Sequence, residues 1–149
     1  MKILVVEDEP LIAASIDWEL RDAGYEVIGP AGDAVHAAAL ARAMRPDLAL
    51  VDINLAGHGD GVVLARTLGR QGVASIFVSG QVAEARENCD AALGVVAKPF
   101  AVEQIAAVVR CVAIVLAGGR PTAVPPALEL FSRAPPERAA PAPVYAAGR

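Results

Sequence analysis

The sequence predicts an α/β fold in which five buried parallel strands alternate with amphipathic helices. Two observations support this prediction: short apolar runs of strand length recur along the first 118 residues, and stretches with helical periodicity separate them. This alternation is typical of a parallel sheet with right-handed crossovers and helices on both faces. The length of 149 residues limits the chain to one ordinary domain with an appendage.

The five predicted strands are continuous apolar runs, and four of them are rich in valine and isoleucine. Strands that are buried on both faces of a parallel sheet show such runs in place of a strict alternation of apolar and polar residues. We therefore predict strands at residues 3–6, 26–28, 48–51, 76–78 and 95–97.

Each predicted strand is followed by a stretch with helical spacing of apolar residues. Gly24, Pro46 and Gly118 mark the ends of three of these stretches, because glycine and proline end helices. The predicted helices cover residues 10–23, 33–44, 60–70, 82–91 and 101–117.

The last part of the chain, residues 119–149, differs in composition and is predicted to be a flexible tail. It holds seven of the eleven prolines, a density that argues against regular helix or sheet. One apolar segment, residues 127–131, is too short for a stable helix by itself but long enough to dock as one. We therefore predict a domain at residues 1–118, followed by the tail.

Composition and charge exclude several classes of protein. The net charge of −4 provides no basic footprint for nucleic acid. The chain has no apolar stretch of 18 residues, so we predict no membrane span, and the first residues lack a signal peptide, so we expect a cytoplasmic protein. Cys89 and Cys111 form neither a disulfide framework nor a metal-binding spacing, and we expect both to be reduced and packed on helices.

Polar side chains follow the predicted strands at the edge where parallel sheets bind ligands. Glu7 and Asp8 follow the first strand, Asp52 the third, Ser79 the fourth and Lys98 the fifth. Two carboxylates about 4 Å apart repel by about 4 kcal/mol at an effective dielectric constant of about 20. Three such groups therefore indicate a compensating cation.

Oxygen-only ligands favour Mg²⁺ over zinc, and Mg²⁺ commonly combines one or two carboxylates with water and phosphate oxygens. Lys98 adds an ammonium group and Ser79 a hydroxyl group to the same edge. A carboxylate beside a metal can attack phosphorus, while the metal and a lysine neutralise the phosphoryl oxygens. The residues thus indicate a phosphoryl-transfer site around Asp52.

Four motifs in this order, at residues 3–10, 50–55, 77–80 and 98–100, resemble the receiver domain of two-component response regulators. They read Ile-Leu-Val-Val-Glu-Asp-Glu-Pro, Leu-Val-Asp-Ile-Asn-Leu, Phe-Val-Ser-Gly and Lys-Pro-Phe. The resemblance covers about residues 1–118. It implies a flavodoxin-like (βα)₅ fold with strand order 2-1-3-4-5, in which the first and third strands are neighbours.

The resemblance also implies a role for each site residue. Asp52 matches the phosphoacceptor, while Glu7, Asp8 and the backbone carbonyl of Asn54 match the groups that hold Mg²⁺ together with Asp52. Ser79 and Lys98 match the hydroxyl and lysine that contact the phosphoryl group, and the Lys98–Pro99 bond is expected to be cis. The implied donor is a histidine kinase or a histidine phosphotransfer protein.

One position departs from the family pattern. Three residues before the lysine, where the family commonly has tyrosine or phenylalanine, this chain has Val95. A valine cannot swing a ring between buried and exposed states, so we expect Ser79, the loop after it and the fourth helix to carry the signal.

We predict a stand-alone receiver that is not an enzyme, accepts a phosphoryl group and changes its affinity for a partner protein. Two alternatives remain. The first is a haloacid-dehalogenase-like phosphatase, which also uses an aspartate nucleophile and Mg²⁺. That family has its nucleophilic aspartate directly after the first strand and a second aspartate two residues later. This chain has Glu7 and Glu9 at those two positions. The second alternative is a phosphate-independent binding module, against which Asp8, Asp52 and Lys98 argue.

Two surfaces are candidates for contacts with other proteins. Leu11 and Trp18 lie on the outer side of the first helix, beside the acidic site. The last helix is apolar on both sides, so its outer side needs a cover: a homodimer mate, the output partner or the segment that contains Leu128, Leu130 and Phe131. His58, in a glycine-rich loop after Asp52, could influence phosphotransfer, but we interpret it as part of a solvated loop, and we assign no role to His36.

Overall fold

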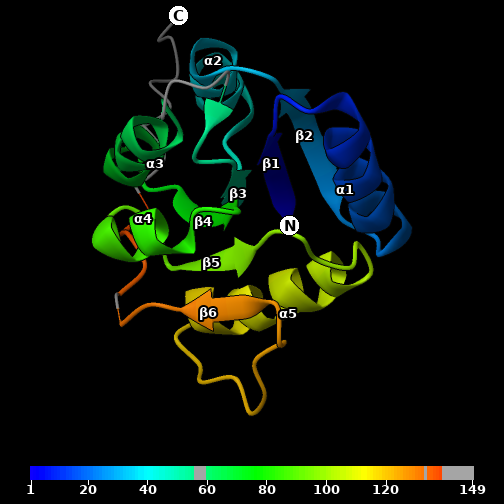
Figure 1. Ribbon diagram of the computed structural model, residues 1–149. Coiled ribbons are helices and arrows are strands. Elements are labelled where there is room, and N and C mark those ends of the chain that lie inside the picture. The colour runs from blue at the N-terminus through cyan, green and yellow to red at the C-terminus, as the bar shows by residue number, and fades with distance from the viewer. Residues whose placement is uncertain (56–59, 133, 139–149) are drawn as a thin grey trace, which may run out of the picture.

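A computed structural model of the chain describes residues 1–55, 60–132 and 134–138. In this part of the chain, a six-stranded sheet in the order β2-β1-β3-β4-β5-β6 is flanked by helices on both faces (Figure 1). The strands are β1 (Lys2–Val6), β2 (Glu26–Ala31), β3 (Leu48–Val51), β4 (Ala74–Ser79), β5 (Gly94–Ala97) and β6 (Leu128–Leu130). The helices are α1 (Pro10–Asp22), α2 (Ala34–Met44), α3 (Asp60–Arg70), α4 (Val82–Glu87) and α5 (Gln104–Leu116).

The predicted α/β fold and the strand order 2-1-3-4-5 are confirmed, since β1 to β5 pair in parallel in this order. The structure adds β6, which runs antiparallel to β5. The third strand and the third helix have the predicted bounds. β2 extends three residues past its predicted end, to Ala31, because its backbone continues to pair with β1 through a bulge.

The sheet divides the apolar core into two layers. Ile16 and Leu20 of α1 share one cluster with Val108 and Val112 of α5, so these two helices cover one face. Helices α2, α3 and α4 supply the clusters on the opposite face. The residues of β3 are all buried, as expected for the central strand of such a sheet.

The fourth helix is shorter than predicted, because it ends at Glu87 and not at residue 91. The side-chain amide of Asn88 donates to the carbonyl oxygen of Glu84 at 2.9 Å, which satisfies a group at the helix end. Beyond it, Ala91 and Ala92 are buried against the sheet. The prediction that Cys89 packs on a helix is therefore wrong: it is exposed after α4, whereas Cys111 is buried on α5, and both are free thiols.

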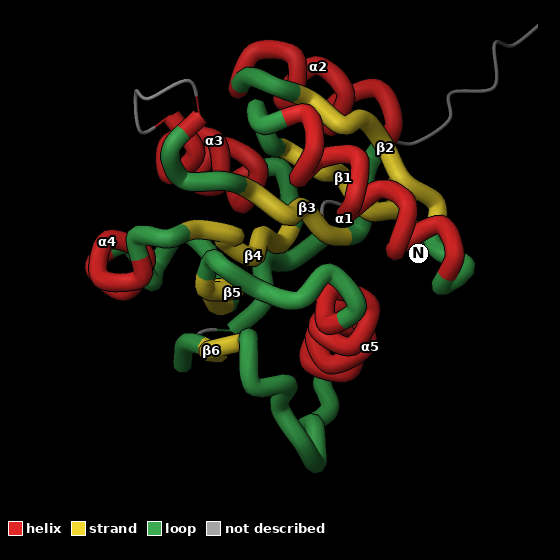
Figure 2. The backbone as a smooth tube through the Cα atoms, turned by 45° about the vertical axis from the view of Figure 1, so that its right-hand side comes forward, coloured by secondary structure: helices red, strands yellow, loops and turns green. Residues whose placement is uncertain are grey.

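The expectation that the proline-rich region forms no sheet is wrong at residues 128–130. Three residues there lack proline, so their backbone groups can pair with β5, and β6 results. Figures 1 and 2 both show β6 beside β5, with α5 next to it. Leu128 joins the core cluster to which α5 contributes, and Leu130 packs against that cluster. Segment 127–131 thus docks as a strand and not as a helix.

No helix in the described ranges is long and apolar enough to cross a bilayer.

Helix α2 begins with a side-chain cap that allows a test of its contribution to stability. The carboxylate of Asp33 accepts a hydrogen bond from the backbone N–H of His36 at 2.7 Å. We predict that Asp33→Ala lowers the free energy of unfolding by about 1 kcal/mol, because the N–H group loses its partner. Urea unfolding measures this loss. Asp33→Asn keeps the acceptor and should remain within a few tenths of a kcal/mol of the wild type; equal losses in both variants would contradict the capping role.

Candidate functional site

Three carboxylates converge where β1 and β3 end. Val6 pairs with Val51, so the residues that follow these strands start from neighbouring positions. Glu7, Asp8 and Asp52 each offer an oxygen that lies within 4.8 Å of the other two. Glu7 and Asp52 are buried, whereas Asp8 is exposed. Two desolvated carboxylates beside an accessible one form a cluster that needs positive charge.

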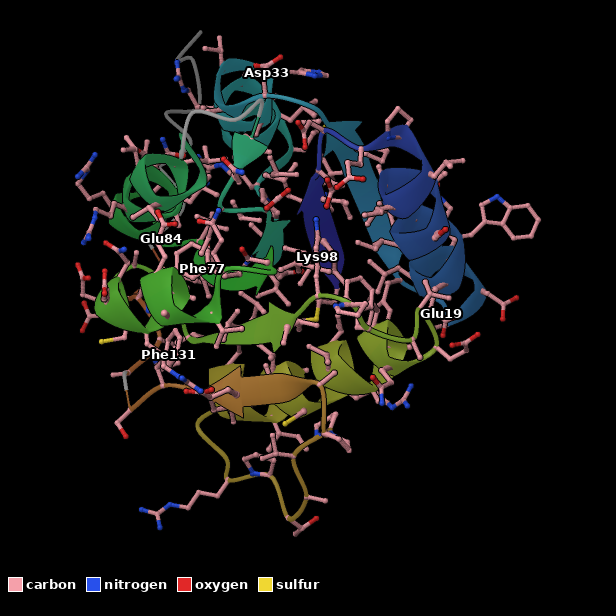
Figure 3. The ribbon with its side chains drawn as sticks, in the orientation of Figure 1. Glu19, Asp33, Phe77, Glu84, Lys98 and Phe131 are labelled. Carbon is pink, nitrogen blue, oxygen red and sulfur yellow. The ribbon has the colours of Figure 1, made fainter. Side chains whose placement is uncertain are left out.

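Lys98 brings one positive charge to this cluster from the end of β5. Its side chain extends from the loop after β5 toward the end of β1 (Figure 3). Its Nζ atom lies 2.8 Å from Oε2 of Glu7 and 3.3 Å from Oδ2 of Asp52. The Lys98 side chain is 17% exposed, against 2% for Glu7 and 8% for Asp52, so water screens these ion pairs only weakly.

The pKa values reflect this environment. Burial raises the pKa of Glu7 above its ordinary value, although the hydrogen bond from Lys98 opposes the shift. Burial alone would lower the pKa of Lys98, but its hydrogen bond to Glu7 and the nearby charge of Asp52 outweigh that effect and raise it. The ammonium group of Lys98 therefore stays charged throughout the physiological range.

Ser79 and Asn54 lie at the same edge. Ser79 is buried at the end of β4, and its hydroxyl oxygen accepts a hydrogen bond from the backbone N–H of Gln81 at 3.0 Å. The backbone N–H of Asn54 donates to Oδ1 of Asp52 at 3.0 Å. The backbone N–H of Lys98 donates to the carbonyl oxygen of Ser79 at 3.0 Å, which joins the ends of β4 and β5. All six predicted site residues therefore belong to one edge of the sheet.

Val95 lies in the interior on β5, which β4 separates from β3. It is 1% exposed and pairs with Phe77 of β4, within the cluster that α3 and α4 cover. An aliphatic side chain with few rotamers is thus held in a close-packed position. His58 lies outside the described residues.

The cluster of Glu7, Asp8 and Asp52 has the donor chemistry of a site for a hard divalent cation. Its three ligand groups are carboxylates, and the distances between their oxygens allow one ion to contact all three. Magnesium prefers such oxygen donors, whereas zinc sites are usually built with histidine or cysteine. The residues present therefore fit Mg²⁺.

Gly61, in the first turn of α3, is a residue of the site that our sequence reasoning missed. A Cβ atom at this position would overlap the carbonyl oxygen of Asp52 and lie 2.7 Å from the Cα atom of Ile53. The backbone N–H of Gly61 also donates to the carbonyl oxygen of Ile53 at 3.1 Å. The only sign of this role in the sequence is a glycine in the first turn of a predicted helix. That glycine indicates a close contact only once the end of β3 is known to lie against it.

An apolar groove of about 460 Å³ opens beside Lys98. Helix α1 contributes one wall, and the residues after β5 contribute the other. It is lined by Leu11, Ile12, Ser15, Ile16, Lys98, Pro99, Phe100 and Val102. Leu11, which lines the groove, is 85% exposed, and Trp18, further along α1, is 79% exposed.

Comparisons with known proteins agree on one family. Residues 3–110 match the family model of the response regulator receiver domain. The transcriptional regulatory protein PdtaR of Mycobacterium tuberculosis is 31% identical over 108 residues, which cover 70% of this chain and 52% of PdtaR. The chain therefore matches about half the length of that relative.

Solved structures show the same similarity. The receiver domain of NtrX from Brucella abortus is 30% identical with a TM-score of 0.66, over 72% of this chain and 94% of that chain. The chemotaxis response regulator CheY4 of Vibrio cholerae is 27% identical with a TM-score of 0.65, over 73% of this chain and 95% of that chain.

The contact of Gly61 with the Asp52 backbone gives a prediction for stability. Gly61→Ala should lower the free energy of unfolding by about 1–3 kcal/mol, because the added methyl group forces α3 or the end of β3 to move. Urea unfolding measures the loss. Gly80→Ala is the matched control, since a Cβ atom at Gly80 meets nothing within 4 Å. An equally stable Gly61→Ala protein would show that this contact does not constrain the site.

Proposed function

The chain belongs to the response regulator receiver domain family, and on this basis we propose that Asp52 accepts a phosphoryl group from a phosphohistidine donor. Phosphorylation then changes the affinity of the protein for a partner. The observation that supports this function best is the position of the Asp52 carboxylate, which adjoins Glu7, Asp8 and the Lys98 ammonium at the ligand-binding edge of the sheet.

The proposed transfer is a displacement at phosphorus. A carboxylate oxygen of Asp52 forms a bond to the phosphorus atom as the bond from phosphorus to the histidine nitrogen of the donor breaks, and the electron pair remains on that nitrogen. Lys98, already 3.3 Å from Oδ2 of Asp52, is placed to pair with a phosphoryl oxygen. Receiver family members are generally phosphoacceptors and not enzymes that act on other substrates.

We propose that Asp8, Asp52 and the backbone carbonyl of Asn54 hold the metal directly and that Glu7 holds it through water. When bound, Mg²⁺ would neutralise negative charge that builds up around the phosphoryl group. The receiver family typically has such an acidic triad for Mg²⁺, and the oxygen donors of this chain fit that ion.

We propose that Ser79 responds to phosphorylation of Asp52 and transmits the signal. Its hydroxyl oxygen accepts a hydrogen bond from the N–H of Gln81, the residue that precedes α4, so a side-chain rotation that carries this oxygen toward a phosphoryl group would break the bond. The loop after β4 and the start of α4 would move with it. Val95 is too tightly packed to contribute a rotating side chain.

The groove beside Lys98 and the exposed Trp18 are the surface that we propose for the phosphohistidine donor. An apolar surface on α1 lets a helical partner dock while its histidine reaches the acidic edge. The donor class is a histidine kinase or a histidine phosphotransfer protein.

Labelling with a small phosphodonor tests the assignment of Asp52. In the presence of Mg²⁺, acetyl phosphate should add one phosphoryl group to the wild type, visible as a mass increase of the intact protein. Asp52→Asn should abolish the addition while circular dichroism shows an unchanged fold, and Asp8→Ala should greatly reduce it. Asp90→Asn, at an exposed carboxylate outside the site, is the control. Equal labelling of Asp52→Asn and the wild type would refute the proposal.

A second experiment tests the donor surface. Trp18→Ala should slow transfer from a phosphohistidine donor at least tenfold but leave labelling by acetyl phosphate unchanged, because it removes contact area and no reacting group. Stopped transfer reactions resolved on gels measure both rates. Val35→Ala removes a similarly exposed apolar side chain, 83% exposed, from α2 and should change neither rate. A parallel fall of both rates in Trp18→Ala would contradict a docking role.

A further inference from the structure

Strand β6 lies outside the matched receiver region, which ends at residue 110, and it occupies the free edge of β5. Gly94, Val95 and Val96 pair with Leu130, Glu129 and Leu128. Two further backbone hydrogen bonds flank this ladder. The N–H of Ala97 donates to the carbonyl oxygen of Ala127 at 3.2 Å, and the N–H of Phe131 donates to the carbonyl oxygen of Leu93 at 2.7 Å. The segment is thus bound through its main chain, in the way that an added strand binds a sheet edge.

The edge of β5 is shaped for a close backbone approach. A Cβ atom at Gly94 would overlap the carbonyl oxygen of Glu129 and lie 3.2 Å from the Cα atom of Leu130. The φ of Gly94 is not in the left-handed region, so the backbone conformation does not demand glycine here. The close approach of β6 accounts for the glycine at position 94, because a side chain there would push that strand away.

The side chains of the bound segment meet complementary groups on the domain. Arg86 of α4 donates from Nε and Nη2 to the two carboxylate oxygens of Glu129, at 2.9 and 2.7 Å. Such a two-bond pair fixes geometry as well as charge. Arg86 thus pairs with the acidic residue that lies opposite Val95.

The residues beside Glu129 meet apolar surfaces. Leu128 is 6% exposed and belongs to the cluster that includes α5. Phe131 packs against the other face, on the cluster that contains Phe77 and Val95 (Figure 3). Residues 128–131 thus contact this edge with an apolar, an acidic, an apolar and an aromatic side chain in turn.

The segment that fills this edge has a small ladder of three paired residues, and Pro125, Pro126, Pro135 and Pro136 flank it and cannot donate backbone bonds. We propose that the β5 edge with Arg86 is a binding site for an extended acidic peptide segment of a partner protein, which residues 128–131 occupy in cis. Charge complementarity at Arg86 and the close approach at Gly94 define this ligand class.

Peptide binding to the full chain tests the proposal. The probe is a fluorescein-labelled peptide with the sequence of residues 126–132, Pro-Ala-Leu-Glu-Leu-Phe-Ser, and a second probe has Lys in place of Glu. In the wild type, the tethered segment competes at an effective concentration of about millimolar, so the probe should bind weakly. In Glu129→Lys the tethered segment is repelled by Arg86, and the Glu probe should bind at least tenfold more tightly than to the wild type.

A charge reversal provides the matched experiment. Arg86→Glu also repels the tethered segment, but it should bind the Lys probe at least tenfold more tightly than the Glu probe. Arg110→Glu, at an exposed arginine of α5, should behave like the wild type. Adding Gly94→Ala to Glu129→Lys should weaken binding of the Glu probe at least tenfold. Fluorescence anisotropy measures all affinities.

Four results would overturn the proposal. The first is equal binding of the Glu probe to the wild type and Glu129→Lys, and the second is the same probe preference in Glu129→Lys and Arg86→Glu. The third is equal protection of the Phe131 amide against hydrogen exchange in Glu129→Lys and in the wild type. If Glu129→Lys sediments as a concentration-dependent dimer without binding the Glu probe, the edge serves a second copy of the chain and the proposal is wrong.

Discussion

The contact of one ammonium group with two buried carboxylates is the constraint on which this structure depends. Glu7 and Asp52 are desolvated at adjacent strand ends, and at about 4 Å such charges repel by about 4 kcal/mol at an effective dielectric constant of about 20. Lys98 lies within 3.3 Å of both and offsets that repulsion. Because the lysine comes from β5 and the carboxylates from β1 and β3, the balance exists only when three strands end together.

Sheet topology makes this meeting possible. In parallel strands every carboxyl end faces the same way, and the order β2-β1-β3-β4-β5 puts β1 beside β3, where the acidic residues are needed. Buried residues at the strand ends then separate the site from bulk water on the sheet side, while Asp8 remains exposed. One side of the cluster is therefore buried, and the other is exposed to solvent and to ligands.

The parts of the structure that sequence reasoning recovered are those with local signals. Residues 48–51 were predicted to the residue, since a continuous apolar run ends there at Asp52. Strand β6 was missed, because three residues become a strand only when Leu93–Ala97, some thirty positions earlier, provide an edge. Gly61 and Gly94 were missed for the same reason: each glycine is required by a backbone that is distant in sequence, and a single residue type does not reveal what approaches it.

Strand β6 also has a consequence for self-association. A parallel sheet ends in an uncovered strand whose unpaired N–H and C=O groups can template pairing with other molecules, and the residues of β5 are apolar. Here β6 caps that strand, and it is itself a poor template, since it is three residues long and carries Glu129. The β5 edge is thus protected against edge-to-edge aggregation, and the residues that protect it come from the most proline-rich region of the chain.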